Sequence, residues 1–246
     1  MENNRLYQTI FKRKSVRNFD PSPLDRETLD GVASQFNKLV PMVPGIRTEM
    51  RLMTNQDVRG MFKVDAPHFL AIFSEEKDGC FLNAGFIMQQ MDLFLSANGI
   101  GSCWQGGPKP TKGLRSVDGL EFVVLLAFGK PKEKIHRESV SEFKRKQLAE
   151  ITDIKGKDDL LEPARLAPSG MNAQPWFFTD GNGAINAYYH KSIIGDHMNQ
   201  IGVGISLCHI WLTSRHLMRN AEISVGPSST REGHRRYAYA ASIKLT

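Results

Sequence analysis

Two long segments of this chain carry apolar residues around the whole circumference of a helix. In the first, about Leu82 to Ala97, the apolar residues are too many for a single stripe, and Asn98-Gly99 follows as a stop signal. The second covers residues 196–219. A helix that is apolar on all sides must be covered on all sides, so we expect both helices to be buried.

The other segments predict shorter helices and strands. Asp25 can cap a helix that runs to about Asn37. Apolar runs predict strands near 49–54, at 66–73, at 122–128 as a central strand, and at 239–245. Two strands, 176–179 and 184–189, flank the hairpin turn of residues 180–183. Helices are expected at 4–13, 140–150 and 158–167, and a glycine-rich turn at 100–108.

Composition and length are those of an ordinary globular protein. Hydrophobic residues make up 41% of the 246 residues and charged residues 24%, enough for one large core or two modest ones. No apolar run approaches the roughly 20 residues that span a bilayer. The amino terminus is polar and lacks the apolar core of a signal peptide. We therefore expect a cytoplasmic protein without membrane contact.

Neither the cysteines nor the histidines indicate a metal site. Cys80, Cys103 and Cys208 lack the close spacing of metal ligands and form no disulfide framework. The seven histidines form no cluster of ligands either. His209 and His216 share one face of a helix, which is more typical of ordinary packing than of metal binding. No metal is therefore expected.

The net charge of +6 invites a nucleic-acid interpretation, but the pattern of charges does not favour it. Basic residues are dispersed, and glutamates interrupt the densest groups, at 130–137 and 144–146. No recognisable nucleic-acid module accompanies them. A solvated surface explains the pattern, with a rim that attracts phosphate as the alternative. We expect no nucleic-acid partner.

The chain also carries a weak internal repeat. If Gly85 is aligned with Gly202, residues 93–95 fall on 210–212, which are apolar in both copies. Each half then has the order helix, loop, strands, long buried helix, strand. A polar stretch at 152–158 resembles a junction, so we divide the chain into halves at 1–151 and 152–246. The alternative is a chance similarity.

Two short motifs carry the chemistry. Residues 167–176 combine small residues, which let a flat ligand approach the backbone, with Ser169, Asn172 and Gln174, which can exchange hydrogen bonds with a polar heterocycle. In residues 13–19, Arg13 and Arg17 lie four apart with a serine between them, and guanidinium groups suit phosphate. The alternative for residues 167–176 is a rigid loop without a ligand. The alternative for residues 13–19 is an exposed basic helix end.

Both motifs resemble signatures of the nitroreductase family, FMN-dependent enzymes that reduce nitro and quinone compounds. In ordinary members the two signatures lie a few tens of residues apart, whereas here they are about 150 apart. Nitroreductases are typically α+β homodimers whose flavin sites take residues from both subunits. The resemblance therefore implies an α+β, nitroreductase-like fold in which two related halves form an intramolecular pseudo-dimer, as in a subgroup built on that fused plan.

The resemblance implies which residues bind FMN, and they come from both halves. The second half carries the loop but no arginine signature, while the first half has residues 39–45 in place of the loop, without its amides. The resemblance therefore implies one complete flavin site between the two halves and one flavin site that has been lost. The implied cofactor-binding residues are Arg13, Lys14, Ser15, Arg17, Trp104, Gln105, Gly106, Gly107, Arg137, Pro168, Ser169, Gly170, Asn172 and Gln174, with Lys134 as an alternative to Arg137. No catalytic side chain is named.

The expected function is that of an FMN-dependent oxidoreductase, which passes hydride from NAD(P)H to a nitroaromatic, quinone or similar acceptor. A small acceptor and NAD(P)H would be its partners, and it would be a monomer acting as a pseudo-dimer, or a homodimer. The alternatives are a non-catalytic protein that binds or stores flavin, and a scaffold of the same fold without flavin. A nucleic-acid binder, which rests on charge alone, would show a steep salt dependence of DNA binding.

Overall fold

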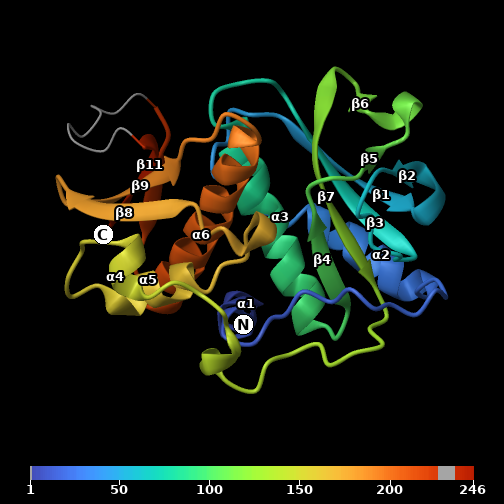
Figure 1. Cartoon of the computed structure of the whole chain (residues 1–246), viewed down its shortest axis with the longest axis horizontal. Helices are drawn as coiled ribbons and strands as arrows, with labels where there is room; N and C mark the ends of the chain where they lie inside the picture. Colours follow the sequence, from blue (N-terminus) through green and yellow to red (C-terminus); the bar gives the residue numbers. More distant parts are fainter. Residues whose placement is uncertain (1, 227–235) are drawn as a thin grey trace.

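The computed structural model describes residues 2–226 and 236–246 and consists of two antiparallel sheets on either side of a pair of long helices (Figure 1). Elements up to residue 151 are α1 (Glu2–Ile10), α2 (Arg26–Phe36), β1 (Thr48–Thr54), β2 (Val58–Arg59), β3 (His68–Ser74), α3 (Cys80–Ala97), β4 (Gly101–Gln105), β5 (Lys109–Pro110), β6 (Ser116–Val117), β7 (Leu120–Gly129) and α4 (Leu148–Ile151). The remaining elements are α5 (Asp158–Arg165), β8 (Trp176–Gly181), β9 (Ala184–His190), α6 (Asp196–His216), β10 (Ala221–Ser224) and β11 (Tyr237–Leu245).

The two main sheets have the same topology. The first has the strand order β1-β3-β7-β4, with the short β6 paired to β7, and the second has the order β8-β9-β11-β10. In each sheet the first two strands along the chain are neighbours, a long helix follows, and the last strand lies beside the second. All pairs within both sheets are antiparallel. This common order agrees with the repeat expected from the sequence.

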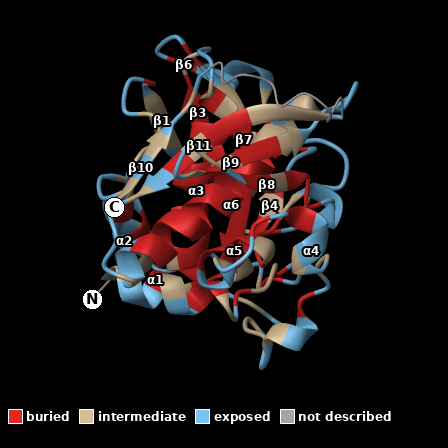
Figure 2. Cartoon of the chain, turned by 90° about the vertical axis from the view of Figure 1, so that its left-hand side faces the viewer, coloured by how far each residue is buried: buried red, intermediate tan, exposed pale blue. Residues whose placement is uncertain are grey.

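The helices α3 and α6 cross at the centre with their backbones almost in contact. A Cβ atom added at Gly85 of α3 would lie 2.2 Å from the carbonyl oxygen of Ile201, and one at Gly204 of α6 would lie 2.0 Å from that of Leu82. Both helices are buried along most of their length (Figure 2), as the sequence predicts. Because the contact is reciprocal, Gly204 is the structural counterpart of Gly85. The sequence alignment, which paired Gly85 with Gly202, is therefore displaced by two residues.

Several predicted elements are present. Asp25 caps α2 by accepting a hydrogen bond from the Thr28 backbone nitrogen at 2.8 Å. β7 is a central strand of the first sheet, and β8 and β9 form the predicted hairpin. Within the described residues, no helix is both long enough and apolar enough to cross a membrane.

Two predicted elements are wrong in part. Residues 101–105 are not a turn but the buried strand β4, which pairs with β7, and only Gly106-Gly107 turns away. Residues 140–150 form no continuous helix. They form a short 3-10 turn at Val140–Glu142 and the single turn α4, each closed by its own capping box. The conformation of residues 143–147, between the two turns, depends on tertiary contacts. Such contacts leave no periodic pattern in the sequence. β10 also escaped prediction.

The segment after β7 crosses from the first sheet to the second (Figure 1). It runs antiparallel to the arginine motif, with bridges from Phe19 to Pro131 and from Arg13 to His136. At its far end Thr152 pairs in parallel with Phe178 of β8, and its hydroxyl donates a hydrogen bond to the Phe178 carbonyl at 3.0 Å. The junction between the two halves is thus attached to the edge of the second sheet.

His209 joins three helices at the centre of the core. It is fully buried on α6, with Nδ1 2.8 Å from the Pro163 carbonyl oxygen of α5 and Nε2 3.1 Å from the Gln89 amide nitrogen of α3. These partners require Nδ1 to donate and Nε2 to accept, which is the neutral ring. Burial, reinforced by Arg13 and Arg145, lowers the pKa of His209 to about 3.

We predict that Gly85→Ala lowers the free energy of unfolding by at least about 3 kcal/mol, because the new methyl group meets backbone that cannot yield without separating α3 from α6. Gly31→Ala in α2 is the matched control. Its Cβ meets nothing within 4 Å, so it should stabilise the protein by about 0.5–1 kcal/mol. Chemical denaturation checks both values, and equal effects would contradict the close contact.

We also predict a pH dependence that belongs to His209. Its pKa is 6.5 when exposed and about 3 when folded, so the unfolded chain binds the extra proton first. Stability should fall by about 1.4 kcal/mol for each pH unit below 6.5 until the folded pKa is reached. His209→Gln should lose this part of the slope between pH 6.5 and 4, measured by urea denaturation. An unchanged slope would refute the assignment.

Candidate functional site

A cavity of about 520 Å³ lies between the two halves, and both sequence motifs line it. Its volume falls within the range of roughly 300–1,000 Å³ that is usual for small-molecule sites. The predicted site residues that line it are Ser15, Arg17, Trp104, Gly106 and Gly107 from the first half and Pro168, Ser169 and Gly170 from the second. The structure thus brings together motifs that are about 150 residues apart in the sequence.

The arginine motif is held in an extended conformation beside β4. Val16 donates its backbone N–H to the Ser102 carbonyl at 2.9 Å, and its side chain is fully buried. Because successive side chains of extended backbone point to opposite sides, Ser15 and Arg17 lie on the other side from Val16 and line the cavity. Gly101 permits the approach, since a Cβ there would lie 2.9 Å from the Val16 side chain.

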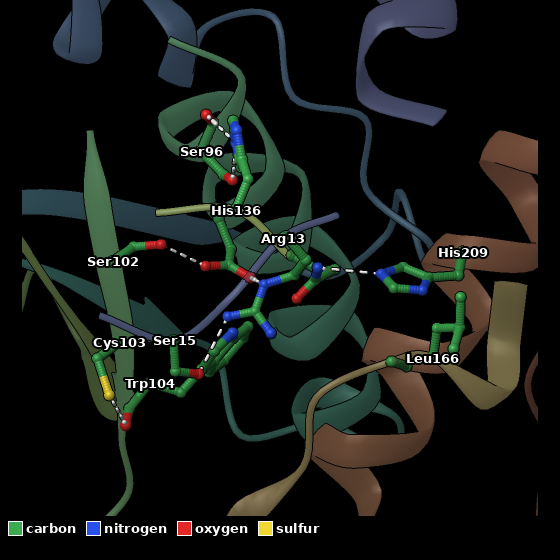
Figure 3. Close-up of polar contacts among 12 residues, drawn as sticks. Arg13, Ser15, Ser96, Ser102, Cys103, Trp104, His136, Leu166 and His209 are labelled. Carbon is green, nitrogen blue, oxygen red and sulfur yellow. Dashed lines mark hydrogen bonds and ion pairs between the residues drawn. The ribbon is translucent and has the colours of Figure 1, made fainter. Parts of the chain in front are cut away.

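Arg13 is buried below the cavity in a network of fixed polar groups. Its Nε lies 3.0 Å from Asp92 Oδ2 on α3, with both side chains almost fully buried. The Ser102 hydroxyl donates to Asp92 Oδ1 at 2.6 Å, and Arg13 Nη2 donates to Ser15 Oγ at 3.1 Å (Figure 3). The network fixes the position of Ser15 at the cavity wall.

Two more arginines, Arg137 and Arg145, gather near Arg13, and Glu142 is a carboxylate whose charge acts on Arg137. Arg137 donates to the Arg13 carbonyl oxygen, and its guanidinium lies over the Phe143 ring at 4.1 Å. The guanidinium of Arg145 is 5.6 Å from the same ring. Neither Arg137 nor Arg145 forms an ion pair within residues 2–226 and 236–246. Burial first, and then Arg13 and Arg137, lower the pKa of Arg145 to about 10. This cluster carries an excess of positive charge.

The two other basic residues of the motif behave differently. Lys14 does not line the cavity; it forms an ion pair with Glu133 at 2.8 Å and donates to the Lys134 carbonyl. The hydrogen bond from Lys14 is the main cause that lowers the pKa of Glu133. The guanidinium of Arg17 is exposed at the cavity and has no hydrogen bond or ion pair with any described residue. Arg17 is therefore the cation available to a ligand.

The loop of the second half divides its polar side chains between the cavity and the crossing segment. Pro168, Ser169 and Gly170 line the cavity. Asn172 accepts from Arg145 Nη1 at 2.6 Å and donates to the Lys144 carbonyl at 2.7 Å. Gln174 Oε1 accepts from the Lys146 backbone at 2.7 Å. Neither amide lines the cavity; both attach the loop to residues 144–146.

Trp104 near the end of β4 and the glycine turn after β4 both line the cavity. Gly106 and Gly107 line the cavity, and a Cβ at Gly106 would lie 2.6 Å from Cε of Met198. Trp104 also lines the cavity, and its indole Nε1 is buried without a hydrogen-bond partner among the described residues. Gln105 instead faces inward, accepting from the Val64 backbone at 3.0 Å.

The sequence reasoning missed two residues of this network. Asp92 is the one acidic residue of α3, and a carboxylate inside a fully buried helix was a usable signal for a buried cation partner. Arg145 gave no signal, because it belongs to a cluster of charges that resembles an ordinary surface. Its hydrogen bonds to the carbonyls of Leu166 and Ala167 arise only after the chain folds.

The counterpart loop of the first half lies against α3. Asn83 Oδ1 accepts hydrogen bonds from the backbone nitrogens of Met42 and Val43 at 2.8 and 3.0 Å. The Met42 side chain is buried in the core. This loop is thus attached to α3 through its backbone and to the core through Met42. No group of three or more His, Cys, Asp or Glu that could hold a metal occurs in the described part of the chain.

Comparison with known protein families identifies the chain. Residues 5–214 match the family described as "Putative TM nitroreductase". The chain belongs to the nitroreductase family. The family is one of oxidoreductases, and the match covers both motifs and both long helices of this nitroreductase.

The solved structure of another protein shares its fold. A crystal structure of a protein from Thermotoga maritima, also described as a putative nitroreductase, matches with a TM-score of 0.65 and 19% identity, covering 97% of this chain and 92% of that one. A nitroreductase with bound FMN from Desulfitobacterium hafniense covers 58% of this chain and 99% of its own, with 15% identity and a TM-score of 0.43. No curated protein matches significantly.

We predict that Asp92→Asn lowers the free energy of unfolding by about 3–5 kcal/mol, because it leaves the buried Arg13 without its counter-charge. Glu138→Gln makes the same chemical change in the exposed pair with Lys134 and should cost less than about 1 kcal/mol. Urea denaturation at pH 7 gives both values. Comparable small losses would show that Arg13 does not depend on Asp92.

Proposed function

We propose that this nitroreductase is an FMN-dependent oxidoreductase that passes hydride from NAD(P)H to a nitroaromatic, quinone or similar acceptor, with one site per chain. The observation that supports the proposal most is the single cavity lined by Ser15 and Arg17 from one half and by Pro168, Ser169 and Gly170 from the other. A single chain then supplies what two chains supply in a homodimer, and it would work as a monomer acting as a pseudo-dimer.

The residues present fit FMN in charge and shape. A phosphate dianion requires fixed cations. Arg13, Arg137 and Arg145 carry three positive charges, whereas Asp92 is the one buried carboxylate that pairs with them. Burial of this excess positive charge is unfavourable, and the lowered pKa of Arg145 reflects this cost. An anion bound nearby would reduce the cost. Glycines at 106, 107 and 170 leave room for a flat ring.

The residues of the cavity then have separable tasks. FMN, when bound, supplies the acceptance and return of hydride. Arg17 would stabilise negative charge that develops at the edge of a bound ring, and Ser15, fixed by Arg13, would orient it. Apolar side chains such as Ile201 and Ile205 exclude water from the cavity. No side chain has to supply a proton to the hydride step itself.

We predict that the purified protein, after reconstitution and desalting, retains about one FMN per chain, read from its visible absorption. Arg17→Gln should weaken FMN binding by about 10–100-fold without changing stability, because it removes one charge-assisted contact from an exposed, unpaired side chain. Lys12→Gln, an exposed basic residue of the same segment that does not line the cavity, is the matched control.

Anaerobic addition of NAD(P)H should bleach the flavin bands, and a nitroaromatic or quinone acceptor should restore them. Retention without bleaching would favour a flavin-storage protein. Two FMN per chain would contradict the single site, and no retained flavin would contradict the cofactor altogether.

A further inference from the structure

Exposed apolar side chains are concentrated at the mouth of the cavity. The structure describes eight large hydrophobic residues that are strongly exposed, and five of them lie in three short segments at this place: Met61, Phe62, Met171, Ile193 and Ile194. Phe62, Met171 and Ile194 line the cavity directly, and the other two are their chain neighbours. We name these five residues the apolar rim. Single exposed apolar residues are normal, whereas a cluster around a cavity marks a binding surface.

The backbone of the rim is strained in order to present these side chains. Phe62 has φ of 60° and Met171 has φ of 51°, in the left-handed region that favours glycine. A non-glycine residue costs roughly 1–2 kcal/mol there. Neither side chain offsets this by packing, since Phe62 is 88% exposed and Met171 is fully exposed. Strain without burial is typical of a functional site.

The apolar surface continues inward from the rim. Below it the cavity is lined by apolar side chains including Val124, Met198 and Ile201, and among the described residues of the lining Arg17 alone is charged. A ligand that follows this surface would have a polar, electron-accepting head near Arg17 and an apolar part that extends outward. A compact acceptor would fill the inner cavity and leave the rim in water.

We propose that the apolar rim binds the aliphatic tail of the electron acceptor, so that a quinone with a long apolar chain is the preferred substrate class. This inference rests on the proposed function, in which NAD(P)H and one proton reduce the quinone to the hydroquinone and NAD(P)⁺ is released. The rim takes residues from both halves, Phe62 from the first and Met171 and Ile194 from the second. Tail binding therefore depends on the same pairing of halves as the cavity.

The test compares two benzoquinones that share one dimethoxy-methyl head, one without a tail and one with a ten-carbon chain. Equilibrium dialysis on the purified protein gives the two dissociation constants. Each methylene removed from water favours binding by roughly fourfold, so a tail covered by the rim along even two or three methylenes should bind at least about 10-fold more tightly. Turnover with NAD(P)H is measured separately on the same samples.

The decisive variant is Phe62→Ser/Met171→Ser/Ile194→Ser. All three side chains are exposed, so the fold should persist, and the ratio of the two dissociation constants, which measures the preference for the tailed quinone, should fall to within about twofold. Leu52→Ser and Met218→Ser are matched controls, because both are exposed apolar residues that do not line the cavity, and Met218 also has a positive φ of 58°. Both should keep the preference.

The possible results separate the rim from the chemistry. Tighter binding of the tailed quinone without turnover would support the rim and overturn the proposed function. Turnover with equal binding of both quinones, or a preference that survives the triple variant, would overturn the rim and leave the function. Loss of a concentration-dependent dimer in the triple variant, with no tail preference, would show that a second copy of the chain covers the rim, and would also overturn this proposal.

Discussion

The close approach of α3 and α6 is the constraint on which the rest of the molecule depends. Gly85 and Gly204 let each helix lie against the backbone of the other, and no larger residue fits at either position. This contact holds the two sheets at a fixed spacing on opposite sides of the helix pair (Figure 1). The cavity lies at the border of the halves, lined by residues of both, so its shape follows from that spacing. A change that separates the helices would therefore alter the site without touching any residue that lines it.

The crossing segment after β7 adds a second, polar connection between the halves. Its Arg145 donates to the carbonyls of Leu166 and Ala167 and to the side chain of Asn172, and the backbone N–H of its Lys146 donates to the side-chain oxygen of Gln174. The loop that lines the cavity is thus held in position by residues that do not line it. The same segment brings Arg137 and Arg145 close to Arg13. The crossing segment therefore both attaches the loop and brings the arginines together. The buried positive charge, which is unfavourable in itself, accompanies the attachment of the loop.

The sequence predicted what depends on local pattern and failed where distant contacts decide. The all-round apolar character of α3 and α6, the cap at Asp25 and the β8–β9 hairpin are recorded in neighbouring residues, and all were predicted. The glycines of residues 100–108 predict a turn, but residues 101–105 form the strand β4, in which Gly101 is needed for contact with Val16. The motifs indicated that Ser15, Arg17 and residues 168–170 belong together. They could not indicate that Asn172 and Gln174 bind the crossing segment, because Arg145 and Lys146 carry no pattern that identifies them as partners.

The two halves lie in one chain, so they can differ at corresponding positions. In a symmetric homodimer every substitution occurs in both sites, so loss of a loop amide damages both. In a single chain the loop at residues 39–45 can change alone. Here Asn83 fixes that loop to α3 through Met42 and Val43, and Met42 joins the core. The loop of the first half packs on the core, whereas residues 168–170 of the second half line the cavity. The strained, exposed side chains of Phe62 and Met171 lie at that cavity.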